Sequence, residues 1–87
     1  NMRILNLIEK ARWYDMIERL EKPEDYRAIK QYWTKRIGRF DAVRLHYGYT
    51  KRSMLFECRG ISVGKGNPEW GAPPEDVYII KLGKRIE

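Results

Sequence analysis

The sequence has little of what a metal centre or a disulfide-stabilised fold requires. Cys58 is the only cysteine among 87 residues, and His46 is the only histidine. A single cysteine forms no internal disulfide, and one Cys with one His falls short of the ligand set of a zinc site. We therefore predict no metal and no cofactor. We expect Cys58 to be a small buried apolar residue and His46 to lie on the surface of a strand.

Long apolar runs are also missing. No stretch approaches the ~20 apolar residues that cross a bilayer. The apolar residues 4–8 are interrupted by Asn6 and are too short for the core of a signal peptide. We expect no membrane association and a cytoplasmic location. Asn1 precedes Met2, as in a remnant of a cleaved tag, so residues 2–87 are expected to form the natural chain as one domain.

Acidic residues are scarce in one segment. Residues 27–52 contain eight basic residues and a single acid, Asp41, so the segment carries +7 while the whole chain carries +6. The basic residues are Arg27, Lys30, Lys35, Arg36, Arg39, Arg44, Lys51 and Arg52. The same segment holds five aromatic residues, and cations with aromatic faces are typical of nucleic-acid surfaces. A solvated face that maintains solubility is an equally good interpretation of the charge alone.

The hydrophobic pattern predicts short strands and two short helices. Strands are predicted at residues 3–8, 24–30, 41–47, 53–63 and 77–82, with a further one at 84–86 after a turn at Gly83. Helices are predicted at residues 10–20 and 31–37. In the first helix, an apolar face is expected from Trp13, Met16, Ile17 and Leu20. In the long fourth strand, Gly60 is expected to form a bulge or bend.

The order of these elements predicts an α+β fold. No βαβ repeat is present, so a purely parallel sheet is not expected. Mixed strands in so small a domain usually curl on themselves. We therefore predict a small β-barrel of five to six strands with two short helices, the first of which covers one opening.

Two blocks of sequence resemble the ASCH domain family of the PUA-like superfamily. Residues 13–17 lie in the first predicted helix. They are followed by Lys22-Pro-Glu-Asp-Tyr-Arg27, which is similar to the family motif G-x-K-x-x-E-x-R. Lys22 and Arg27 match, Asp25 replaces the glutamate and Leu20 replaces the glycine. Residues 60–73 and 77–83 resemble very small ASCH-like proteins. The resemblance implies a PUA-like barrel with a cleft beside the first helix, and RNA as a partner.

The same resemblance implies a catalytic alternative. Some small bacterial ASCH proteins hydrolyse the amide of N4-acetylated cytidine with a Lys-x-x-Thr pair and a distant glutamate. Lys22 matches the lysine, whereas Asp25 occupies the threonine position and lacks its hydroxyl. A carboxylate can instead act as a general base on water. Glu57, in the middle of a strand, is the candidate for the distant glutamate, so the catalytic candidates are Lys22, Asp25 and Glu57.

Each of these residues also has a structural interpretation. Lys22 is either a cleft lysine that meets a phosphate or exchanges protons, or a solvated lysine among acids. Asp25 and Arg27 share one face of a strand, where they either orient a base edge or form an ion pair that closes the barrel mouth. Tyr32 and Arg36 are expected to meet on one helical face and to clamp a base and its phosphate, while Trp33 and Ile37 face the core.

The remaining ligand contacts are expected from the basic segment and from the Gly-rich loop at residues 64–75. Arg44 is predicted to meet phosphates, and Lys65 and Asn67 to reach a ligand from the loop. Three functions are therefore open. The first is a module that binds RNA or a modified nucleoside in a basic cleft. The second is a small amidohydrolase acting on N4-acylated cytidine or a related nucleoside, and the third is an interaction domain for an acidic protein.

Overall fold

Five strands form one mixed sheet in the order β1-β3-β4-β5-β2. The computed structural model describes all 87 residues. Strands β1 and β3 are parallel, and the other neighbours are antiparallel. The strands are β1 (Ile4–Glu9), β2 (Glu24–Ala28), β3 (Ala42–Tyr47), β4 (Ser53–Gly64) and β5 (Val77–Arg85). The helical segments are α1 (Ala11–Glu18), α2 (Gln31–Thr34) and the 3₁₀ turn η1 (Pro68–Trp70).

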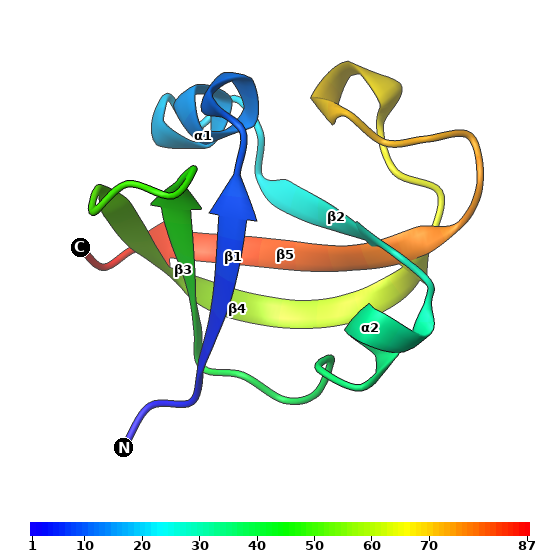
Figure 1. Cartoon of the computed structure of the whole chain (residues 1–87), viewed down its shortest axis with the longest axis horizontal. Helices are drawn as coiled ribbons and strands as arrows, with labels where there is room; N and C mark the ends of the chain where they lie inside the picture. The colour runs from blue at the N-terminus through cyan, green and yellow to red at the C-terminus, as the bar shows by residue number, and fades with distance from the viewer.

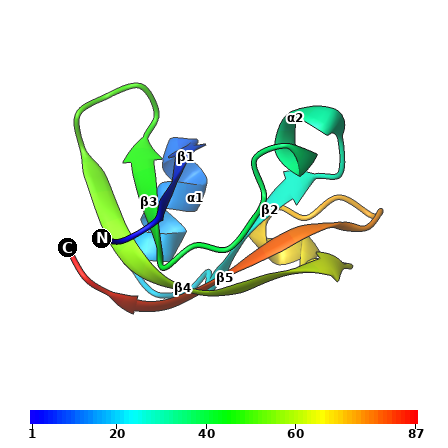
Figure 2. The ribbon, with the colours of Figure 1, turned by 90° about the horizontal axis from the view of Figure 1, so that it is seen from below.

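The sheet curls into a half-barrel whose two edge strands, β1 and β2, are not paired with each other. Seen from below, β1 and β3 stand on one side and β2 with α2 on the other, with β4 and β5 along the floor (Figure 2). The predicted α+β class with five strands and two short helices is confirmed. The sheet stays open because β2 pairs only with β5, which leaves a seam between β2 and β1.

Strand β4 supplies the bend that makes the sheet curl. Its first half pairs with β3 and its second half with β5, with register shifts between Phe56 and Cys58 and between Cys58 and Gly60. Gly60 has φ 121°, a conformation that favours glycine, so the predicted bulge is confirmed. The predicted turn at Gly83 is wrong, because β5 continues through it to Arg85.

The core lies inside the curl and under α1. The strand predicted at residues 41–47 is confirmed as β3, in which Val43 and Leu45 are both fully buried. Nine residues from four strands and α1 form the buried cluster: Leu5, Leu7, Tyr14, Ile17, Val43, Leu45, Met54, Phe56 and Ile80. Cys58 is partly buried against this cluster rather than fully enclosed.

Helix α1 lies at one end of the half-barrel, above β1 and β3 (Figure 1). It turns Tyr14 and Ile17 into the core, whereas the expected apolar face included Leu20 and omitted Tyr14. That prediction is wrong at Leu20, which is 73% exposed, because the helix ends at Glu18. Leu20 has φ 63°, the left-handed conformation that glycine adopts without strain, and this is the position at which the ASCH motif has glycine.

The other helical segments are short. Helix α2 ends at Thr34 rather than at residue 37, and β2 ends at Ala28 rather than at residue 30. The 3₁₀ turn η1, drawn in gold, stands at the same end of the half-barrel as α1 (Figure 1). None of the helices has the length and apolar character needed to pass through a bilayer.

Candidate ligand-binding site

A pocket of about 190 Å³ opens at the α1 end of the seam between the two edge strands. Its walls come from the end of β1, from α1, from β2 and from η1. The lining residues are Ile8, Glu9, Lys10, Trp13, Lys22, Asp25, Tyr26, Arg27, Trp70 and Gly71. The structure therefore brings Lys22, Asp25 and Arg27 into one cavity, with three aromatic side chains around them.

Lys22 is buried, with 3% of its surface exposed. Its Nζ lies 4.5 Å from the ring centroid of Tyr26 and 5.3 Å from that of Trp13, and it donates a hydrogen bond to the backbone oxygen of Trp70. Burial lowers the pKa of Lys22, and the negative charge of Asp25 offsets part of this effect. An ammonium has three donors, and the protein provides Lys22 with one acceptor.

Arg27 bridges the seam from β2 to β1. Its Nε lies 2.7 Å from Asp25 Oδ2, and its Nη2 lies 2.7 Å from Glu9 Oε2. The same Nη2 donates to the backbone oxygen of Ile8 at 3.1 Å, and the guanidinium lies over the Trp33 ring at 4.9 Å. The predicted Asp25–Arg27 pair is therefore present. Through Glu9 and Ile8, Arg27 also links β2 to β1, two strands that share no backbone hydrogen bonds.

Glu9 is the glutamate that faces Asp25, and it was not among the site residues predicted from the sequence. It is 3% exposed at the end of β1. Burial and the neighbouring charge of Asp25 raise the pKa of Glu9 from 4.5 to about 9, although Arg27 and Lys22 act in the opposite direction. Glu9 is therefore protonated at neutral pH. The available signal was an acid directly after an apolar run, a position where a carboxyl group meets little water.

Glu57 lies outside this pocket. Its side chain is 44% exposed, accepts a hydrogen bond from the Lys84 backbone N–H at 2.9 Å and lies 3.6 Å from Arg59. Alternation along β4 explains this placement, because the preceding residue, Phe56, points into the core and Glu57 points away from it. Glu57 and Lys22 therefore do not act on one ligand in this structure.

The Gly-rich loop contributes Trp70 and Gly71 to the pocket, not Lys65 and Asn67. Lys65 is exposed and pairs with Asp76 at 3.2 Å. The Asn67 side chain caps η1 by accepting from the Glu69 N–H. Gly71 has φ 94°, and a Cβ there would come within 2.7 Å of the Trp13 ring. Glycine is therefore needed where this loop meets α1 and closes the pocket wall.

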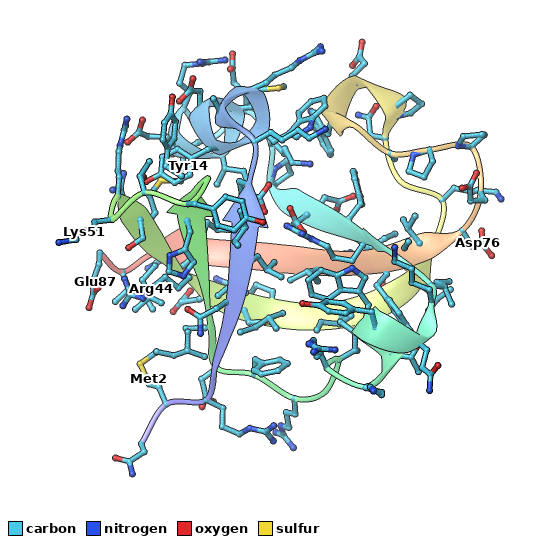
Figure 3. The ribbon with its side chains drawn as sticks, viewed as in Figure 1. Met2, Tyr14, Arg44, Lys51, Asp76 and Glu87 are labelled. Atoms are coloured by element: carbon cyan, nitrogen blue, oxygen red, sulfur yellow. The ribbon has the colours of Figure 1, made fainter.

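Part of the basic segment is neutralised by acids from outside it. Arg52 pairs with Glu18 at 2.9 Å, and Arg44 pairs with Glu87 at 2.9 Å, away from the pocket and beside the C-terminus (Figure 3). The cations of the segment that form no ion pair are Lys30, Lys35, Arg36, Arg39 and Lys51. The positive charge available to a partner is therefore concentrated around α2 and the loop after it.

Tyr32 and Arg36 meet on the outer face of the α2 segment, as predicted. The Arg36 guanidinium lies 3.6 Å from the Tyr32 ring centroid, and its Nη1 donates to the Tyr32 backbone oxygen at 2.7 Å. Tyr32 is 53% exposed, whereas Trp33 packs partly against the core. The structure contains no group of three or more His, Cys, Asp or Glu side chains that are placed to hold a metal ion.

Comparisons with protein-family models, with curated proteins and with solved structures found no match to this chain.

Proposed function

We propose that the protein binds a nucleobase, from RNA or from a modified nucleoside, in the pocket around Lys22. We also propose that the chain is a very small ASCH-type domain of the PUA-like superfamily. The three motif residues Lys22, Asp25 and Arg27 support both statements, because they line one cavity beside the first helix.

The observation that carries the proposal is the environment of Lys22. A buried lysine is unfavourable unless its charge is compensated, and this ammonium has two aromatic rings beside it but a single protein hydrogen-bond acceptor and no ion pair. Its other donors are available to a ligand. Because the walls are aromatic rings, the ligand that fits best has a flat face and acceptor atoms on its edge, as a nucleobase does.

The size of the cavity agrees with a single ring. An apolar cavity of about 150 Å³ takes up benzene, whereas sites for drug-sized ligands measure about 300–1,000 Å³. At about 190 Å³ the pocket accommodates one six-membered ring. The polar groups around it provide both donors and acceptors, because protonated Glu9 and Lys22 donate while Asp25 accepts. A base edge presents the complementary mixture.

The first prediction concerns affinity and salt. Single-stranded RNA is expected to bind, and the logarithm of the binding constant is expected to fall with the logarithm of salt concentration by about 0.7 for each phosphate neutralised. Replacing Lys22 with glutamine is expected to weaken binding about ten- to a hundredfold, through loss of a hydrogen bond from a charged donor. Fluorescence anisotropy at about 50 and about 200 mM salt measures both effects.

The matched control is Lys84→Gln, which removes one exposed lysine from β5 outside the pocket. Circular dichroism establishes that both variants fold. Equal affinity of the two variants, or no binding of the unmodified protein at the lower salt concentration, would rule out the proposed role of the pocket.

A second candidate function is hydrolysis of an N4-acylated cytidine. The observation that favours it is the set of buried titratable groups with shifted pKa values in one pocket, since burial lowers the pKa of Lys22 and raises that of Glu9 to about 9. In this reaction Asp25 takes a proton from water as the water oxygen bonds to the acyl carbon. The bond from that carbon to N4 then breaks, and Glu9 or Lys22 protonates the leaving amine.

The second prediction separates hydrolysis from binding. If the protein is an amidohydrolase, N4-acetylcytidine is converted to cytidine and acetate, and Asp25→Asn lowers the rate at least about a hundredfold by removing the base. Glu57→Gln leaves the rate unchanged, because Glu57 lies outside the pocket. Chromatography of the nucleosides measures turnover. Absence of turnover by the unmodified protein leaves the binding function alone.

A further inference from the structure

A second cavity, of about 450 Å³, adjoins the pocket along the seam. The two cavities share four lining residues, Ile8, Glu9, Lys10 and Arg27. The second cavity extends past α2 to the turn between β3 and β4. The two cavities therefore lie side by side along the open edge of β1, the first between α1 and η1 and the second between α2 and the turn after β3. We call the second cavity the β1 groove.

Exposed side chains with large apolar surfaces gather along the β1 groove. Eight large hydrophobic residues of the chain are exposed, and three of them, Ile8, Tyr32 and Tyr49, line this groove. Tyr49 is 94% exposed in the turn after β3. The Gly48 N–H donates to the Glu9 backbone oxygen at 2.9 Å, which fixes this turn beside the end of β1. The turn therefore holds Tyr49 beside the groove, which it lines.

The opposite wall comes from α2. The Tyr32 and Trp33 rings meet edge to face, with centroids 4.9 Å apart, and Arg36 stacks on Tyr32. The charges around the groove are positive, because Lys10 and Arg36 form no ion pair and Arg27 holds the only acid among the lining residues, Glu9. Aromatic faces beside unpaired cations are the features by which proteins bind single-stranded nucleic acid.

We propose that the β1 groove holds the nucleotide adjacent to the base in the pocket, and that the ligand is therefore single-stranded nucleic acid rather than a free nucleoside. This inference rests on the proposed function and adds a second subsite to it. Tyr49 and Tyr32 provide faces on which the neighbouring base stacks, and Lys10 and Arg36 meet the phosphates beside it.

The experiment compares ligands of two lengths. The probes are the four ribonucleoside 5′-monophosphates and the four corresponding homotrinucleotides, titrated by isothermal calorimetry. For the base that the pocket prefers, the trinucleotide is expected to bind about tenfold or more tightly than the monophosphate. Tyr49→Ala is expected to remove that gain and to leave the affinity for the monophosphate unchanged, because Tyr49 does not line the pocket.

Two controls define the outcome. Tyr49→Phe keeps the stacking face and is expected to keep the tighter binding, and thermal melting should be unaltered in both variants because the side chain is almost fully exposed. Trinucleotides that bind no better than monophosphates, or that bind Tyr49→Ala as tightly as the unmodified protein, would overturn the second subsite alone. If neither length binds, the proposed function fails together with it.

Discussion

Replacing Arg27 with leucine is expected to lower the free energy of unfolding by about 3–5 kcal/mol, because removal of one partner from a buried ion pair leaves the other charge uncompensated. Arg27 is the cation that Asp25 and Glu9 both contact, and its side chain is only 16% exposed. The same substitution removes the bridge between β1 and β2. For a domain with a total stability of about 5–15 kcal/mol, this loss is large. Urea denaturation at neutral pH measures it.

The matched control for this prediction is Arg44→Leu. Arg44 also pairs with a glutamate, but its partner, Glu87, is 60% exposed, and pairs of this kind contribute about 0–1 kcal/mol. Arg27→Lys provides an intermediate case, because it keeps the charge and loses the forked donors that reach two carboxyl groups and a backbone oxygen. A loss in Arg27→Leu that is no greater than in Arg44→Leu would mean that the seam is not held by Arg27.

Replacing Glu9 with glutamine is expected to change how stability depends on pH. The pKa of Glu9 is about 9 in the folded protein and about 4.5 when the chain is unfolded. Between these values the unfolded state has lost a proton that the folded state keeps, so stability falls as pH rises, by up to about 1.4 kcal/mol per pH unit. The contribution of Glu9 to the free energy of unfolding is complete below about pH 4.5 and is lost as pH rises to about 9.

Glutamine resembles the protonated carboxyl group and does not titrate. Glu9→Gln is therefore expected to match the unmodified protein near the acid end of this range and to be more stable than it near the alkaline end. Lys22 has the opposite effect, because its pKa is lowered in the folded protein and stability therefore rises with pH below 10.5. Both proteins contain Lys22, so this effect cancels when their stabilities are compared. Thermal melting across the range measures the difference, with Glu57→Gln as control. Parallel curves for Glu9→Gln and the unmodified protein would contradict the buried, protonated state of Glu9.

The features that the sequence predicted correctly are local ones. The strand at residues 41–47, the bulge at Gly60 and the pairing of Asp25 with Arg27 depend on residues a few positions apart. Each has a period or a backbone preference that is visible without the fold. Leu20 shows the limit of such patterns. It continues the helical period of the apolar face, yet the chain leaves the helix before reaching it.

The sequence could not place Glu9 beside Asp25, because the two residues approach each other across the seam and not along a strand. No backbone pairing joins β1 to β2, so no register relates the two residues. The open seam was unpredictable for the same reason. Closure of a sheet depends on strand tilt and register, and the sequence gives neither.

The charge pattern of the sequence overestimated the positive charge that is available to a partner. The +7 segment counts Arg44 and Arg52, whose acidic partners Glu87 and Glu18 lie outside the segment and reach them only after folding. Of the five cations that remain without carboxylates, all but Lys51 lie beside α2, near the exposed Tyr32 ring. The positive surface available to a partner is therefore smaller than the 26-residue basic segment and is centred on α2.

The most direct test of base binding uses the three tryptophans as reporters. Trp13 and Trp70 line the pocket, and Trp33 lines the β1 groove. In a ¹H–¹⁵N spectrum their indole N–H signals can be assigned by substituting each ring in turn and followed while RNA is titrated. Base binding in the pocket predicts saturable shifts of the Trp13 and Trp70 signals, and in Lys22→Gln both shifts are expected to require about ten- to a hundredfold more RNA. RNA that binds without moving either signal would contradict the assignment of this pocket.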